Sequence, residues 1–226
     1  MSVTRTPRKI SYPDADGKPM AESDLHRDWM VRILDLLKRR YRGEQVYISG
    51  NLFVYYEEGN PKKCVSPDAF VVRGRSSENR RTYKVWEEGG LPPEVVFETT
   101  SRKTKKNDTD VKPGRYLEMG VKEYFLYDPT SDYLKPPIRG FRRIGDSFIP
   151  IESDAAGWLS SEILGLSLGL DGRDLVIRDT KTGEVLLTDV EAEHNSRNAA
   201  EAAQRLAEEK IRSLEAELAR FRAGAG

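Results

Sequence analysis

The sequence has little of what several kinds of protein and site require. It contains one cysteine, Cys64, and two histidines among 226 residues. A single cysteine excludes an intrachain disulfide and a cysteine-rich zinc site, and two histidines argue against zinc of any kind. No run approaches the roughly 20 apolar residues of a membrane span, and the first residues lack the apolar segment of a signal peptide. We therefore expect an intracellular, cytoplasmic protein.

An excess of charge of either sign is also absent. Lysine plus arginine and aspartate plus glutamate each count 37, so the formal net charge is zero. Overall charge thus does not point to nucleic acid, and any basic binding surface must be local. Charged residues make up 33% and hydrophobic residues 38%, a balance that indicates a solvated extension beside one domain of ordinary size.

The pattern of residues divides the chain into three segments. Residues 1–20 are rich in proline with little periodicity, which predicts an extended N-terminal arm. Residues 21–188 form the expected domain, and residues 189–226 form a C-terminal helix. In this helix one seam follows alternating steps of three and four residues: Ala200, Gln204, Ala207, Ile211, Leu214, Leu218 and Phe221. The seam predicts a coiled coil and a homodimer, the alternative being a helix packed on its own domain or exposed to solvent.

Within the domain, helical and strand patterns alternate. Helices are expected over 22–41 and 108–119, the second closed by Gly120. Residues 46–56 read as two strands or one bulged strand, and "VKEYFLYDP" as a further strand. The runs "DAFVVRG" and "PEVVFETT" predict central strands buried on both faces, while "IRGFRRIGDSFIPI" and "LVIRDTKTGEVLL" predict hairpins. This order predicts an α/β fold with a central mixed sheet flanked by helices.

Two carboxylates stand in these central apolar runs. Asp68 opens the first and Glu98 lies in the second. An ionised carboxylate in an apolar strand is costly unless it is paired or bound to a cation. If the strands are neighbours, both side chains could hold one Mg²⁺ or Mn²⁺ ion, which prefer oxygen ligands. A basic run that could attract a phosphate backbone follows: Arg102, Lys103, Lys105 and Lys106. Together these groups suggest metal-assisted hydrolysis of phosphodiester bonds.

The same stretches carry a resemblance to a known family. "SPDAFVV", followed by "EVVFETTSRKTKKNDTDVKPGRYLEMGVKEYFLYDP", is similar to the Uma-two family, described as restriction endonucleases of the PD-(D/E)XK nuclease superfamily. The resemblance includes "DGKPMAESDLH" and runs from residue 12 to about residue 150. The residues of its combined downstream pattern are Glu98, Ser101, Asp108, Lys112, Tyr116, Gly120, Val121, Glu123, Tyr124, Asp128 and Pro129.

The resemblance implies a restriction-endonuclease-like core and a Mg²⁺- or Mn²⁺-dependent endonuclease acting on DNA. Asp68 and Glu98 would be the metal ligands. Lys112, on the following helix, would be the catalytic lysine, because Thr100 occupies the usual lysine position. Residues in supporting positions would be Glu22, His26, Asp108 and Tyr116.

Several alternatives remain open at this stage. Pro113 and Gly114 follow Lys112 directly, so the helix could begin there and turn the side chain away; Lys103 or Lys105 could then take its place. Asp108 could instead be a helix cap.

Two functions other than a nuclease also remain as alternatives. One is a catalytically degenerate nuclease-fold module that binds nucleic acid or mediates assembly. The other is a coiled-coil adaptor whose α/β domain docks a partner.

Overall fold

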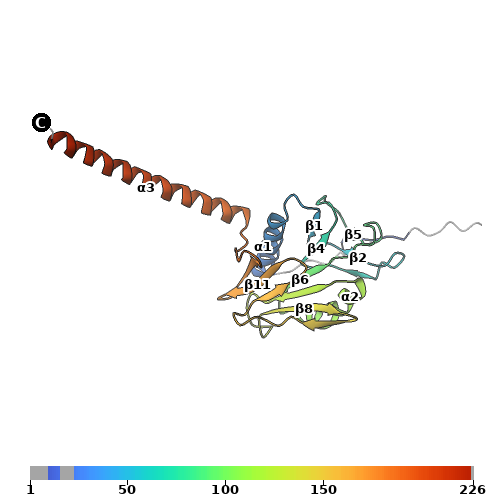
Figure 1. Cartoon of the computed structure of the whole chain (residues 1–226). Coiled ribbons are helices and arrows are strands. Elements are labelled where there is room, and N and C mark those ends of the chain that lie inside the picture. The colour runs from blue at the N-terminus through green and yellow to red at the C-terminus, as the bar shows by residue number, and fades with distance from the viewer. Residues whose placement is uncertain (1–9, 16–22, 225–226) are drawn as a thin grey trace, which may run out of the picture. The chain divides into compact units, whose positions relative to one another are not determined.

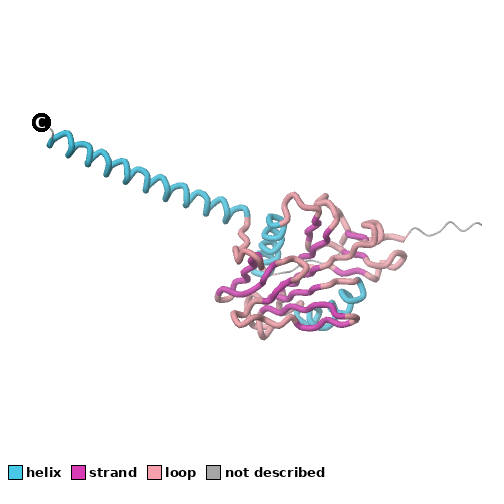
Figure 2. The backbone as a smooth tube through the Cα atoms, viewed as in Figure 1, coloured by secondary structure: helices cyan, strands magenta, loops and turns pink. Residues whose placement is uncertain are grey.

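The computed structural model describes residues 10–15 and 23–224. The chain divides into two compact units between Leu186 and Leu187, and Figures 1 and 2 trace the backbone of each. Most of the predicted N-terminal arm lies outside the described residues. In its described part, Tyr12 packs against the rings of Tyr55 and Trp86, and the Tyr55 hydroxyl donates to the carbonyl of Pro13. Tyr12 and Pro13 therefore take part in the packing of the first unit.

The helices of the first unit are α1 (Asp24–Arg40), the π-helical turn η1 (Asn107–Val111) and α2 (Lys112–Met119). Its strands are β1 (Val46–Ser49), β2 (Val54–Tyr55), β3 (Cys64–Val65), β4 (Ala69–Arg73), β5 (Tyr83–Lys84), β6 (Val95–Thr99), β7 (Glu123–Tyr127), β8 (Ile138–Ile144), β9 (Ser147–Pro150), β10 (Leu159–Ser161), β11 (Leu166–Asp171) and β12 (Asp174–Asp179). The second unit holds α3 (Asp189–Gly224).

A six-stranded mixed sheet organises the first unit. Its strand order is β1-β4-β6-β7-β8-β9. Strands β6 and β7 are parallel, and the connection between them contains η1 and α2. The other neighbouring pairs are antiparallel. The two apolar runs predicted as central strands are β4 and β6, and they are neighbours in the middle of this sheet.

Each face of the sheet supports its own core. On one face, α1 and the three-stranded sheet β10-β11-β12 pack together with Val95 and Phe97 of β6. On the other face, α2 and the small sheet β3-β2-β5 pack together with Val96. Helices α1 and α2 can be followed on the two sides of the sheet in Figure 1. The predicted α/β class, with a central mixed sheet flanked by helices, is confirmed.

Helix α1 shows why its sequence forms a helix at this position. The Ser23 hydroxyl caps it by accepting from the backbone N–H of His26 at 3.3 Å, and serine is a preferred N-cap. Its apolar side, including Ile33, Leu36 and Leu37, is buried against the sheet. The helix was predicted to begin at residue 22, and α1 begins at Asp24 because Ser23 is the cap.

The two predicted hairpins have different outcomes. Residues 138–151 form the hairpin β8–β9, as predicted. Residues 175–187 form a shorter hairpin than predicted: the Asp179 N–H donates to the Glu184 carbonyl at 2.9 Å and the Leu186 N–H to the Ile177 carbonyl at 2.8 Å. The other edge of β12 pairs with β11 along its whole length. After the turn at Gly183 the chain returns through an isolated bridge between Arg178 and Val185.

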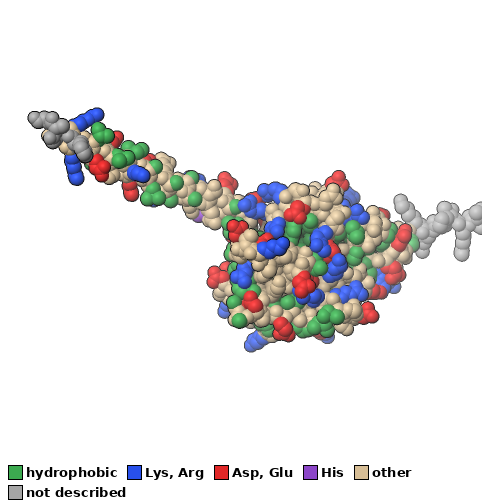
Figure 3. Space-filling view, viewed as in Figure 1, with side chains coloured by type: hydrophobic (Ala, Val, Ile, Leu, Met, Phe, Trp, Pro, Cys, Tyr) green, Lys and Arg blue, Asp and Glu red, His purple; other side chains and the backbone are tan. Residues whose placement is uncertain are grey.

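Helix α3 is 36 residues long, and hydrophobic side chains lie open on its visible surface (Figure 3). Among the residues that the structure describes, no helix combines the length and apolar character needed to cross a membrane.

Candidate active site

Strand register brings Asp68 and Glu98 together. In the antiparallel pair β4–β6, Ala69 lies opposite Phe97, so one further step places Asp68 opposite Glu98. Residues opposite one another project from the same face of a sheet, with Cβ atoms about 5 Å apart. The backbone N–H of Thr99 donates to Asp68 Oδ2 at 2.7 Å, which fixes the Asp68 carboxylate at the end of β6.

Glu98 is held by two residues of α2. Lys112 Nζ donates to Glu98 Oε2 at 2.7 Å, and the Tyr116 hydroxyl donates to Oε1. Lys112 and Tyr116 are four residues apart, so both project from one side of the helix. Glu98 is 1% exposed and Tyr116 is fully buried. The carboxylate is thus oriented by donors on both oxygens.

The π-helical turn η1 explains how Lys112 reaches Glu98. Pro113 has no N–H and cannot extend the α-helical hydrogen-bond pattern back into the preceding turn. The chain accommodates it with a wider turn, in which the Lys112 N–H bonds the carbonyl of Asn107. Helix α2 therefore begins at Lys112, as Pro113 suggested, but the side chain still points to Glu98. The alternative lysines, Lys103 and Lys105, are exposed on the segment before η1.

Asp108 is a second buried partner of Lys112. It lies within η1 and is fully buried, with Oδ1 3.0 Å from Lys112 Nζ. The Tyr124 hydroxyl donates to the Asp108 carbonyl at 2.6 Å. Because Lys106 is the residue that precedes η1, Asp108 is not a helix cap. One ammonium group therefore bridges the carboxylates of Glu98 and Asp108.

His26 lies beside Asp68. Its Nε2 atom is 3.4 Å from Asp68 Oδ2, and the histidine is 2% exposed. It projects from the first turn of α1, so three elements converge at Asp68: α1, β4 and β6. Glu22, the other residue expected at this helix start, lies outside the described residues.

The predicted basic residues follow the site directly in the chain. Arg102, Lys103, Lys105 and Lys106 are exposed. They lie between the end of β6, which carries Glu98, and η1. Their contact with DNA stays a prediction.

Burial and mutual repulsion set the charge state of the site. Burial raises the pKa of Glu98 well above its ordinary value, nearby Lys112 opposes this shift, and the charges of Asp68 and Asp108 add to it. Burial also raises the pKa of Asp108. Burial alone would lower the pKa of Lys112, but the adjacent carboxylates of Glu98, Asp108 and Asp68 outweigh it and raise that pKa. Lys112 therefore stays protonated.

The negative charge of the site and its carboxylate oxygen atoms are both suited to one divalent cation. If all three carboxylates ionise, the single ammonium of Lys112 leaves an excess of two negative charges. Asp68 and Glu98 offer the hard oxygen atoms that Mg²⁺ and Mn²⁺ prefer. Within the described part of the chain, no group of three or more His, Cys, Asp or Glu side chains is arranged to hold a metal. Two carboxylates suffice for Mg²⁺, which commonly keeps several waters.

Gly50 is a site-supporting residue that sequence reasoning missed. A Cβ atom on Gly50 would lie 1.9 Å from the backbone oxygen of Asp68, so no other residue fits without a shift of the backbone. The neighbouring Asn51 N–H donates to the carbonyl of Pro67 at 2.8 Å. The available signal was the glycine inside the run "VYISGNLFVYY", which marks a close backbone approach.

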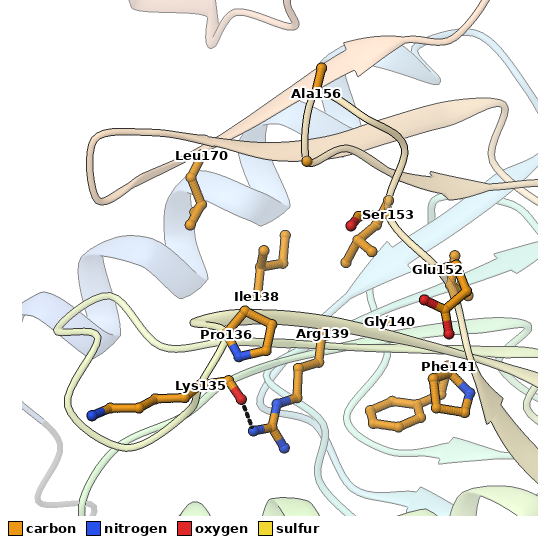
Figure 4. Close-up of a pocket in the computed structure, with 14 residues that line it drawn as sticks. Lys135, Pro136, Ile138, Arg139, Gly140, Phe141, Glu152, Ser153, Ala156 and Leu170 are labelled. Carbon is orange, nitrogen blue, oxygen red and sulfur yellow. Dashed lines mark hydrogen bonds between the residues drawn. The ribbon is translucent and has the colours of Figure 1, made fainter.

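A pocket elsewhere in the first unit does not contain this site. It has a volume of about 580 Å³. Its lining comes from β8 and the two residues Lys135 and Pro136 before it, from the end of β9 and the segment after it, and from single residues of β10 and β11. Figure 4 shows Ile138 and Leu170 in its wall and the Arg139 guanidinium bonded to the Lys135 carbonyl. None of its described lining residues is a predicted site residue.

Residues 4–171 match the model of the Uma2 family, which is described as "Putative restriction endonuclease". The chain belongs to the Uma2 family. This confirms the family resemblance found in the sequence, and membership supports a nuclease. The matched region includes Asp68, Glu98 and Lys112 and ends before α3.

Comparison with solved structures and curated proteins adds little to the Uma2 assignment. The chain is similar to a crystal structure titled a putative nuclease, from Anabaena variabilis ATCC 29413. The two are 13% identical, with a TM-score of 0.47 over 65% of this chain and 76% of that chain. A search of curated proteins finds no match.

Proposed function

We propose that this Uma2 protein is a Mg²⁺- or Mn²⁺-dependent endonuclease that hydrolyses DNA phosphodiester bonds. The observation that supports it most is the placement of Asp68 opposite Glu98, with the Lys112 ammonium 2.7 Å from Glu98. Two carboxylates at the same end of two central strands, with a lysine beside them, are the groups that metal-assisted phosphodiester hydrolysis uses.

Each side chain has a role in this proposal. Asp68 and Glu98 hold the cation, which when bound supplies positive charge to the phosphate and lowers the pKa of a water molecule. Lys112 stabilises the negative charge that develops on the attacked phosphate. Tyr116 and His26 are positioning residues, because they contact Glu98 and Asp68 respectively.

The substrate and assembly also belong to this proposal. The exposed basic residues after Glu98 favour a phosphate backbone as the substrate, and DNA is the form implied by the family description. The seam of α3 favours a homodimer, which provides two active sites for the two strands of a duplex.

The test is cleavage of supercoiled plasmid by the full-length protein with Mg²⁺ or Mn²⁺. We expect Asp68→Ala and Glu98→Gln each to reduce the cleavage rate at least about a hundredfold, because each removes a cation ligand. Glu118→Gln is the matched control: Glu118 is exposed on α2, and the variant should cleave at the wild-type rate. Circular dichroism checks that every variant is folded.

Three results would count against the proposal. Equal cleavage rates for the wild type and both site variants would show that Asp68 and Glu98 are not active-site residues. Binding of DNA by the wild type with no cleavage in either metal would favour a catalytically degenerate binding module. Cleavage of RNA but not of DNA would support phosphodiester hydrolysis at this site and contradict DNA as the substrate.

A further inference from the structure

The seam of α3 leaves large apolar side chains in water. Ile211, Leu214 and Leu218 are 55%, 50% and 53% exposed. In heptad positions abcdefg, Ile211 and Leu218 occupy a, and Leu214 occupies d. An apolar stripe of this kind on a long polar helix is stabilised when a second helix covers it.

We infer that α3 pairs with α3 of a second copy as a parallel, in-register, two-stranded coiled coil. The inference deepens the proposed homodimer by specifying its orientation and register, and it depends on that dimer. It does not depend on the nuclease chemistry, because the groups that carry it all lie in α3.

The distribution of side-chain size along the seam favours this arrangement. Large residues occupy the C-terminal part of the seam, whereas Ala200, Gln204 and Ala207 occupy the part before it. Parallel, in-register pairing sets Ile211 against Ile211 and Leu214 against Leu214. Antiparallel pairing over the same seam would set Leu218 against Ala207 and leave a gap. Isoleucine at a with leucine at d is also the combination typical of parallel dimers.

The charges beside the seam favour the same orientation. In a parallel pair, each g residue faces the e residue five positions later in the second copy. Lys210 then faces Glu215, and Glu217 faces Arg222, so both pairs have opposite charges.

Two further features of the charges support parallel pairing. The neighbours of Lys210 three and four residues away are Leu206, Ala207, Ser213 and Leu214. Its charge therefore has no partner position within its own helix. The antiparallel alternative would place Glu208 beside Glu215 of the second copy, which is repulsive, and Lys210 beside Glu217, which is attractive. Its charges therefore cancel, whereas both pairs of the parallel arrangement are attractive.

Orientation decides where the two catalytic units are tethered. In a parallel pair both helices begin at the same end of the coil, at Asp189. Leu187 and Thr188 alone join each first unit to its helix. The two first units are therefore tethered at the same end of the coil.

A charge exchange in the full-length protein tests the pairing. The variants are Lys210→Glu, Glu215→Lys and the double variant, with dimer dissociation measured by sedimentation velocity over a range of concentrations. Each single change creates two like-charge contacts, and we expect it to raise the dimer Kd about tenfold. The double variant should return to within about twofold of the wild type. Failure of the double variant to recover overturns the parallel register.

Cysteine cross-linking gives an independent measurement. Ala200→Cys and Ala207→Cys, both at d positions, are made separately in a Cys64→Ser background. In a parallel, in-register pair both should form disulfide-linked dimers, since each cysteine meets its own copy. Ala202→Cys, at the outer f position, is the matched control and should stay largely unlinked. An antiparallel pair can bring at most one of the two seam cysteines to its counterpart.

The outcomes separate this inference from the proposed function. A chain that is monomeric at all concentrations overturns the coiled coil, whatever its nuclease activity. If both seam cysteines cross-link but the protein does not cleave DNA, the proposed nuclease function is wrong and the parallel coiled coil stands. Leu214→Asp should dissociate the dimer, whereas Leu206→Asp, outside the seam, should not.

Discussion

At the scale of single residues, the site depends on one ammonium group shared by buried carboxylates. Lys112 lies 2.7 Å from Glu98 and 3.0 Å from Asp108. Two buried acids next to each other are tolerated because this cation compensates them. The prediction of Lys112 came from the family resemblance. Its pairing with Asp108 follows the four-residue helical spacing that the sequence already shows. Its bond to Glu98 could not be read from the chain, because it depends on how α2 packs on the sheet.

Removing that ammonium should destabilise the fold. We expect Lys112→Met to lower the free energy of unfolding by about 3 kcal/mol, because it leaves two carboxylates buried without a cation. Urea denaturation monitored by circular dichroism measures the change. Lys105→Met, an exposed lysine of the same segment, is the control and should change stability by less than about 0.5 kcal/mol.

A double-mutant cycle identifies the cause of this loss. In the Asp108→Asn background, Lys112→Met should cost less than in the wild type, because one of the two carboxylates has been neutralised. Equal costs in both backgrounds would show that packing of the lysine chain, and not its charge, holds the site together.

At the scale of elements, the β4–β6 register places the carboxylates. Each strand pattern predicted an apolar run with an acidic residue, but neither run specifies which residues lie opposite each other. Register is decided by the two cores, because a slip by one residue would exchange the faces of Phe97 and Glu98. Gly50 then allows the backbone beside β1 to approach the start of β4.

Gly50→Ala should disturb this approach. The added Cβ would overlap the Asp68 backbone oxygen, so we expect a loss of about 2 kcal/mol in unfolding free energy. Gly114→Ala is the matched control, because nothing lies within 4 Å of a Cβ there. In helix α2 the alanine should be neutral or stabilising by up to about 1 kcal/mol. Thermal denaturation compares the two, and similar melting temperatures would contradict the close approach.

At the scale of the whole first unit, an ion-pair network ties the sheet at the end opposite the active site. Glu94 accepts from Arg73 at 2.6 and 3.0 Å and from Lys122 at 2.7 Å. It thereby links the end of β4 to the starts of β6 and β7. The hydrogen bond from Arg73 is the largest effect on the pKa of Glu94. With the hydrogen bond from Lys122 and the charges of both partners it outweighs burial, and the pKa falls from 4.5 to about 2.

This network should make stability depend on pH. Because the pKa of Glu94 is lower in the folded protein, its stabilisation is present above pH 4.5 and is lost as the pH falls towards 2. Glu94→Gln should therefore cost about 1 kcal/mol at neutral pH, a value kept small by partial exposure of its partners. The difference from the wild type should vanish in acid. Urea denaturation across this pH range checks it, and a constant difference would contradict the assignment.

The sequence by itself determined the α/β class, the two central strands, the family and the periodic seam of α3. Those features are local, since they depend on residue types at fixed spacings along the chain. The position of Glu22 and most of the N-terminal arm lie outside the described residues, and the cytoplasmic location and domain boundaries stay predictions.

Tertiary structure alone decided which side chains meet. Strand register set Asp68 opposite Glu98, and the wide turn before Pro113 together with the packing of α2 on the sheet brought Lys112 to Glu98. These outcomes join residues that are far apart in the chain, and each follows from competition among burial, hydrogen bonding and charge over the whole unit. A local pattern does not contain that competition.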